Sequence, residues 1–171
     1  MAKSGAVGQK MEITPNPIMS NSLSSSALFS GQECYTLDEK GRVTVPKSWR
    51  NQDVDSEEFY LVPDSAGACL RAMRPDYFAK IGDEARDLPG MDAKKHKLFL
   101  RNFFSQSVLV STDKQGRIAV PKDYCDRFKL SGEIAMLGAR DLFELWNKAA
   151  LKERQKAEAP EFGHFADALG L

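Results

Sequence analysis

The chain has 171 residues, of which 24 are Lys or Arg and 24 are Asp or Glu, so its formal net charge is zero. This length suits one compact domain or two small intertwined ones. The even balance excludes the strongly basic domain that is the usual signature of nucleic-acid binding, although cations gathered on one face can still bind DNA. No apolar run approaches the length of a membrane span, so we expect no membrane partner.

The N-terminal segment, residues 1–30, is rich in Ser, Asn and small residues and lacks the apolar stretch of a secretory signal. We expect it to form a flexible tail. The three cysteines, Cys34, Cys69 and Cys125, are an odd number without paired spacing. They are typical of free thiols in a reducing compartment and not of a disulfide framework.

A β-hairpin is predicted after the tail, with strands at residues 35–37 and 42–45. The turn and the second strand read D-E-K-G-R-V-T-V-P. Gly41 supplies the positive φ that such a turn often requires, and the Asp38 side chain can accept hydrogen bonds from nearby backbone amides. Both residues are therefore assigned to the structure of the turn.

Alternation along the second strand decides which side chains face the core. Val43 and Val45 share one face, and Arg42 lies on the other. Arg42 is therefore predicted to point outward. Pro46 follows the strand and opens a short helix at residues 47–50, because proline is tolerated at the first helical position.

Two apolar runs and two helices are predicted next. The runs, residues 59–62 and 69–73, are the length of strands. Pro75 opens a helix with apolar residues at helical spacing, and the Pro89–Gly90 pair breaks the chain after it. A second helix is predicted over residues 93–103.

The nine-residue motif then occurs again at residues 113–121, 75 positions after the first copy. The same offset aligns Thr36 with Ser111 and Leu70 with Leu145 without a gap, so each half is expected to adopt the same local fold. The alternative is two unrelated hairpins with similar turns, which the constant register makes improbable. The second copy therefore predicts inward Ile118 and Val120, outward Arg117 and Ala119, a helix after Pro121 at residues 122–128, and strands at 134–137 and 142–146.

A charged stretch, residues 148–158, reads as a surface helix that ends before Pro160. The apolar residues within 162–171 either dock on a neighbour or fray. The predicted fold class is α+β, mainly β, with two pseudo-symmetric β-hairpin units that form a small barrel with peripheral helices. The expected organisation is a tail (1–30), a first unit (32–76), a helical connector (77–106), a second unit (107–150), and a C-terminal helix and tail (151–171).

The two turns carry the residues most suited to binding. An arginine offers a planar fork of donors for phosphate or for the edge of guanine. The alternative is a solvated turn whose arginine bridges to Asp38 or Asp113, but the duplication favours binding. The predicted DNA-binding residues are Lys40, Arg42, Lys114 and Arg117, and the predicted turn residues are Asp38, Gly41, Pro46, Asp113, Gly116 and Pro121.

Catalysis and metal binding find little support. His96 and His164 lie near no Cys or Ser motif that suggests a nucleophile and its base. No glycine-rich phosphate loop and no zinc-ligand spacing is present. We therefore expect no enzyme activity, no cofactor, no metal and no small-molecule substrate. The basic run Lys94–Lys97 reads as a solvated helix face.

Over residues 31–171 the chain resembles the MraZ family, regulators associated with the bacterial division and cell-wall gene cluster. The resemblance rests on residues 37–42, 113–118, 137–146 and 165–171. The doubled motif is specific, because related AbrB-like proteins carry one such unit per chain. The resemblance implies two tandem SpoVT/AbrB-like units, a cytoplasmic, nucleoid-associated ring-shaped homo-oligomer, and repression through direct repeats in promoter DNA.

The resemblance also assigns residues. The DNA-contacting arginine of the family falls on Arg42 and Arg117, and its neighbouring lysine falls on Lys40. The second copy has Gln115 at that lysine position, so the two tips need not contribute equally. The segment before Gly31 departs from the family pattern. An alternative function on the same fold is a protein-interaction module, an antitoxin-like partner binder.

Overall fold

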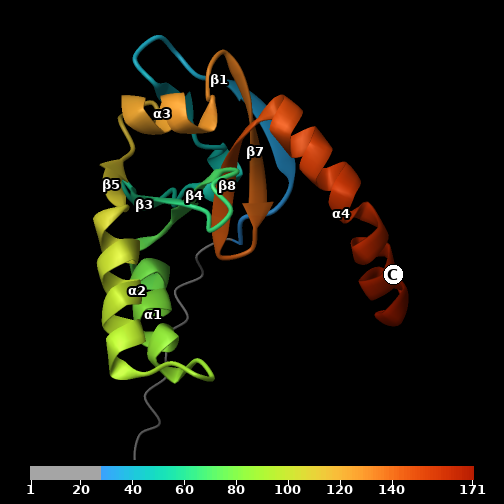
Figure 1. The fold of residues 1–171 in the computed structure, drawn as a ribbon. Coiled ribbons are helices and arrows are strands. Elements are labelled where there is room, and N and C mark those ends of the chain that lie inside the picture. The colour runs from blue at the N-terminus through green and yellow to red at the C-terminus, as the bar shows by residue number, and fades with distance from the viewer. Residues whose placement is uncertain (1–27) are drawn as a thin grey trace, which may run out of the picture.

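The computed structural model describes residues 28–171 (Figure 1). The strands are β1 (Gln32–Thr36), β2 (Arg42–Thr44), β3 (Glu58–Pro63), β4 (Leu70–Met73), β5 (Val108–Ser111), β6 (Arg117–Ala119), β7 (Glu133–Ala139) and β8 (Leu142–Asn147). The helices are α1 (Pro75–Glu84), α2 (Ala93–Ser105), α3 (Lys122–Phe128) and α4 (Lys148–Ala168), with 3₁₀ turns at η1 (Lys47–Trp49) and η2 (Ala85–Asp87).

The strands form two antiparallel sheets, and each sheet contains strands from both sequence repeats. The larger sheet has the order β1-β7-β8-β4-β3-β5, and the smaller one pairs β2 with β6. Val43 pairs with Ile118 in the smaller sheet, and Leu70 pairs with Leu145 in the larger sheet. Each pair joins residues 75 positions apart, so both sheets place equivalent residues of the two halves opposite each other. The predicted common register of the halves is confirmed.

The two halves exchange their first strands. β1 pairs with β7 of the second half, and β5 pairs with β3 of the first half. The prediction that residues 35–37 and 42–45 pair as a hairpin is therefore wrong. Three-residue strands such as β2 make too few hydrogen bonds to hold a hairpin alone. Pairing across the halves instead lets Val43 and Ile118 enter one core, where both are fully buried.

The fold is mixed α and β, and most of the residues in its main core belong to strands. Among the described residues the strands pair as two separate sheets and not as one closed barrel, so the predicted barrel stays unconfirmed. The predicted inward positions are confirmed, because Val43, Val45, Ile118 and Val120 are at most 3% exposed. They share a single core with aromatic residues from both halves, namely Phe29, Trp49, Phe59, Phe128 and Phe143.

The N-terminal end of the described chain is anchored in this core. Phe29 is 1% exposed and its ring meets those of Phe143 and Trp49 at centroid distances of 5.2 and 5.9 Å. The Trp49 indole donates a hydrogen bond to the Ser30 carbonyl. Phe29 and Ser30, which the sequence assigned to the end of the tail, therefore contact the core, because a large aromatic side chain gains most from burial. Residues 1–27 of the predicted tail lie outside the described residues.

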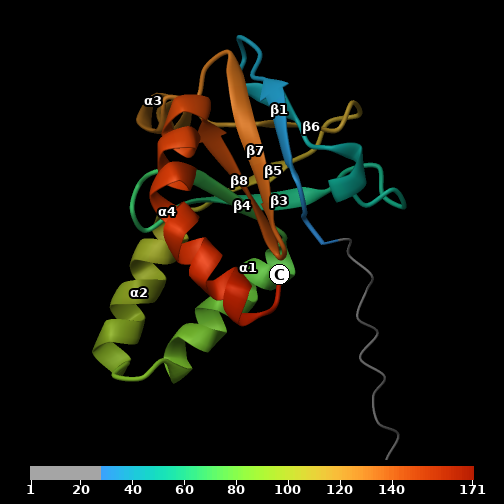
Figure 2. The ribbon, with the colours of Figure 1, turned by 90° about the vertical axis from the view of Figure 1, so that its right-hand side faces the viewer.

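Helices α1 and α2 pack side by side and project from the larger sheet (Figure 2). The Phe78 ring stacks on Tyr60 of β3 at 3.9 Å and on Phe103 of α2 at 4.7 Å. The expected start of α1 at Pro75 is confirmed, and α2 extends two residues beyond its predicted end. Helix α3 has its predicted bounds.

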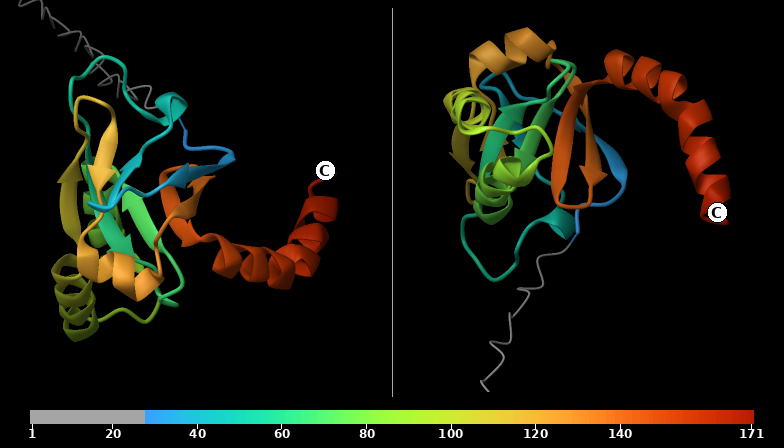
Figure 3. Two further views of the ribbon diagram at one scale, coloured as in Figure 1. Left: turned by 90° about the horizontal axis from the view of Figure 1, so that it is seen from above. Right: turned by 60° about the horizontal axis from the view of Figure 1, so that its bottom comes forward.

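Helix α4 begins at the Asn147 cap, whose side chain accepts hydrogen bonds from the amides of Ala149 and Ala150. The prediction that it ends before Pro160 is wrong, because it continues to Ala168. Pro160 lies on an exposed stretch, where water can satisfy the carbonyl that loses its backbone donor. The helix is bent along its length (Figure 3). None of the helices among residues 28–171 is both long and apolar enough to cross a membrane.

Candidate nucleic-acid interface

The first motif turn is organised by the carboxylate of Asp38. Its Oδ1 accepts the backbone amides of Lys40 at 2.9 Å and Arg42 at 2.8 Å. Its Oδ2 accepts the Arg42 Nε at 2.7 Å. The amide of Arg42, followed by its side chain, holds the pKa of Asp38 below its usual value. Gly41 has the expected positive φ, at +73°.

The second turn repeats this geometry. The Oδ1 of Asp113 accepts the amides of Gln115 and Arg117, both at 2.9 Å. Its Oδ2 accepts Nε and Nη2 of Arg117 at 2.9 and 2.7 Å. The Arg117 side chain lowers the pKa of Asp113 to about 2. Gly116 has φ +74°. The two turns are thus the same device, built from residues 75 positions apart.

The turns also hold each other in place. The Gly41 carbonyl accepts the Val120 amide at 2.8 Å, and the Gly116 carbonyl accepts the Val45 amide at 2.9 Å. A Cβ on Gly41 would lie 2.8 Å from the Val120 oxygen, so only glycine fits this crossing. Through these crossings the Arg117 guanidinium comes within 4.0 Å of the Asp38 carboxylate. Fold symmetry therefore brings the two predicted sites together.

The arginines are half-buried and ion-paired. The Arg42 side chain is 34% exposed and the Arg117 side chain 25% exposed, and each lies 2.7 Å from the carboxylate of its own turn. The bridge to aspartate that the sequence offered as an alternative is thus present. Lys40 and Lys114 are exposed, and within residues 28–171 neither makes an ion pair. Whether these cations contact DNA stays a prediction.

Sequence reasoning missed a further cation, Arg50. Its Nε donates to the Val45 carbonyl at 3.0 Å, and its guanidinium occupies the space beside Gly116. The equivalent position beside Gly41 is held by Cys125, whose Sγ lies 3.7 Å from the Val120 carbonyl oxygen. The 75-residue offset aligns Arg50 with Cys125 and could have revealed this asymmetry.

Two more cations follow the motif prolines. Pro46 and Pro121 cap η1 and α3, as the motif predicted, and the next residues are the exposed Lys47 and Lys122. A lysine directly after V-P in both copies was a signal in the sequence. Lys122 and Lys40 also line a cavity of about 630 Å³ beside the first turn.

Comparison with known proteins fits this doubled site. The sequence profile of the family described as "MraZ protein, putative antitoxin-like" matches residues 103–170. A protein of Syntrophobacter fumaroxidans named "Transcriptional regulator MraZ" is 32% identical over 121 residues, covering 71% of this chain and 80% of that protein. The chain belongs to the MraZ family. Regulation of transcription is the kind of function that this relationship supports.

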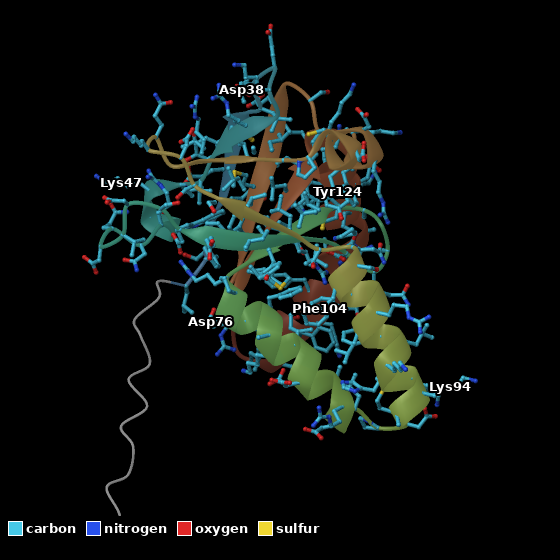
Figure 4. The ribbon with its side chains drawn as sticks, turned by 90° about the vertical axis from the view of Figure 1, so that its left-hand side faces the viewer. Asp38, Lys47, Asp76, Lys94, Phe104 and Tyr124 are labelled. Atoms are coloured by element: carbon cyan, nitrogen blue, oxygen red, sulfur yellow. The ribbon has the colours of Figure 1, made fainter. Side chains whose placement is uncertain are left out.

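Other polar groups of this MraZ-family chain lie apart from the turns. Figure 4 places Lys94, in the basic run of α2, at the opposite end of the molecule from Asp38. The run Lys94–Lys97 therefore does not extend the surface of the turns. The thiols of Cys34, Cys69 and Cys125 are free, and burial raises the pKa of Cys69. Within the described chain no cluster of His, Cys, Asp or Glu suits a metal ion.

Proposed function

We propose that this chain is a transcriptional regulator that represses the division and cell-wall gene cluster by binding direct repeats in promoter DNA. The observation that supports this proposal is the pair of interlocked turns. The two turns lie next to each other, and each presents one arginine and one exposed lysine. A two-stranded β-ribbon of this size can enter a major groove. The repeat therefore supplies two equivalent turns on one protomer for contacting DNA.

The aspartates prepare the arginines for this role. Each carboxylate holds Nε of its arginine, which orients the planar guanidinium and leaves other N–H groups for phosphate or guanine. Ion pairs at this exposure contribute little net stability, so exchanging a carboxylate for a DNA phosphate costs little. Arg50, Lys47 and Lys122 extend the cationic surface, and Arg50 offsets the lack of a lysine at Gln115.

A neutral protomer needs multiplicity to bind DNA tightly. A few cations release few counterions and bind weakly at physiological salt. A ring-shaped homo-oligomer would present many turns, and repeated sites would let several protomers bind at a high effective concentration. Such an assembly would act in the cytoplasm, on the nucleoid. Binding alone explains this activity, and no catalytic group is required.

The test is a gel-shift titration over a salt series, with DNA from upstream of the chain's own gene and scrambled DNA as competitor. Arg42→Ala and Arg117→Ala should each weaken binding by about 10-fold or more and flatten the salt dependence. Lys94→Ala, at the far end of the molecule, is the control that removes one cation elsewhere. Equal binding of both DNAs, or unchanged affinity in both arginine variants, would refute the proposal.

A protein-interaction module remains the second candidate, because the matched family is described as antitoxin-like and large apolar side chains are exposed. Leu98 and Phe104 on α2 are 55% and 47% exposed. This candidate expects a different protein to bind with the turns uninvolved. A purified sample that stays homomeric and shifts promoter DNA would count against it.

A further inference from the structure

The end of α4 carries an apolar stripe that nothing in the described chain covers. Phe162, Phe165 and Leu169 are spaced to share one helix face, and they are 68%, 56% and 77% exposed. We call these three residues the C-terminal stripe. The body of the protein contacts α4 near its start, through buried Leu151, an ion pair between Lys148 and Glu133, and a hydrogen bond from Gln155 to Gln32. Such a stripe is typical of a helix that docks elsewhere.

A matching cavity lies where α1 and α2 meet the larger sheet. Its volume is about 450 Å³, and we call it the α1–α2 pocket. This size suits an inserted aromatic side chain with its neighbours. The apolar part of its lining comes from two helices and three strands, including Met73, Tyr77, Ile81, Phe99, Phe103 and Leu142.

The charges of the stripe and the pocket are complementary. Residues 160–171 contain two acidic side chains, Glu161 and Asp167, and no Lys or Arg. The pocket is lined by Arg71 and Arg127. Arg71 is paired with Glu144, whereas Arg127 makes no ion pair among residues 28–171. Asp64, also in the lining, is already saturated by the amides of the loop that follows it.

The stripe does not reach the pocket of its own chain. Figures 1 and 3 show the end of α4 standing apart from α1 and α2. We propose that the C-terminal stripe of one copy docks in the α1–α2 pocket of a second copy of this chain. An aromatic anchor in an apolar pocket, with opposite charges at the rim, is the usual centre of a stable interface.

The contact would be head-to-tail, because the stripe and the pocket are different surfaces. Every copy then offers one of each, and association continues from copy to copy until a ring closes. This inference rests on the proposed function in one respect: the docking contact is assigned to the ring that binds DNA. The contact itself can be tested without DNA.

Two variants of the full chain separate the surfaces. Phe165→Asp places a charge on the stripe, and Asn102→Trp fills the pocket from an exposed position on α2. Their matched controls are Ala157→Asp, away from the stripe on α4, and Lys97→Trp, away from the pocket on α2. Circular dichroism checks that each variant is folded. Analytical ultracentrifugation gives the masses.

The wild-type chain and both controls should form assemblies larger than a dimer. Each interface variant alone should lose association by about 30-fold or more, as removal of a central anchor does. Mixing the two variants leaves one intact stripe and one intact pocket. We expect a heterodimer of twice the 19.0 kDa of one chain.

Three results would overturn the inference: a monomeric or dimeric wild type, normal assembly of Phe165→Asp, or a mixture that yields no heterodimer. A gel shift on the same samples is read separately. If the wild type assembles as expected but does not bind promoter DNA selectively, the proposed function is wrong and the docking contact is still supported. If the wild type binds promoter DNA selectively but the mixed variants form no heterodimer, the docking contact is wrong and the proposed function is still supported.

Discussion

Each letter of the repeated motif has a separate physical task at the scale of single residues. The aspartate binds two backbone amides and one guanidinium, and the glycine adopts a positive φ and offers its carbonyl to the other half. The arginine stays half-exposed, the aliphatic residues fill the core, and the proline precedes a helix. Because the tasks are distinct, changing one letter should damage one property.

Asp113 should make stability depend on pH. Its pKa is about 2 in the folded protein, below the model-peptide value of 3.8, so the unfolded chain binds the proton more readily. The stabilisation from its ionised form is therefore complete above about pH 4 and is lost as the pH falls towards 2. Urea unfolding of the wild type and Asp113→Asn between pH 2 and 5 measures this contribution.

The stability difference between wild type and Asp113→Asn should shrink as the pH falls. Asp126→Asn, on the exposed surface of α3, controls for the loss of one negative charge. If the stability difference between wild type and Asp113→Asn is constant across this pH range, the ionised carboxylate of Asp113 does not stabilise the fold.

At the scale of elements, the short strands are stable because each is paired across the repeat. β2 and β6 have three residues each, and their central pair, Val43 with Ile118, is fully buried. The first described residues add to the same core, since Phe29 also receives the Arg74 guanidinium at 4.3 Å from its ring centroid. Phe29, which precedes β1, is therefore part of the fold.

Phe29→Ala tests this role. The substitution removes a fully buried ring, and we expect it to lower the free energy of unfolding by about 3–5 kcal/mol. Leu28→Ala, at a neighbouring position that is 61% exposed, should change it by less than about 0.5 kcal/mol. Urea denaturation followed by circular dichroism measures both. Equal effects of the two substitutions would mean that the segment only rests on the surface.

At the scale of the whole molecule, the exchanged strands tie the two halves together. Within the larger sheet, β1 pairs with β7 of the second half and β5 pairs with β3 of the first half, and the glycine carbonyls accept hydrogen bonds from the opposite half. The main core also contains residues of both halves, such as Val43 and Ile118. The zero net charge of the chain is compatible with a cationic surface at the turns. Cations from both motifs lie close together there, whereas the acidic residues are spread over the turns and the rest of the molecule.

The two halves should therefore unfold in one transition. The chain has one tryptophan in each half, Trp49 and Trp146, and both are at most 5% exposed. Trp49→Phe and Trp146→Phe leave a fluorescent reporter in one half at a time. After each substitution, the fluorescence midpoint in urea should coincide with the midpoint from circular dichroism of the same variant. Separate midpoints within either variant would show that the halves fold independently.

Much of the local structure could be predicted from the sequence because it depends on neighbouring residues. The positive φ of the turn glycines, the inward valines and the bounds of α3 follow from turn chemistry, alternation and proline placement. The register of the two halves followed from the 75-residue repeat. The family resemblance was also available, because the motif occurs twice.

The tertiary structure alone decided the partners of these elements. Strand exchange, the burial of Phe29 and the place of Arg50 beside Gly116 depend on residues far apart in the chain, and no local pattern encodes them. The passage of α4 through Pro160 was missed because solvent exposure, which lowers the cost of a lost hydrogen bond, is a property of the folded molecule. The sequence by itself determined two equivalent turns. Only the pairing of β2 with β6 brought them together, because burying Val43 and Ile118 in one core requires that crossing.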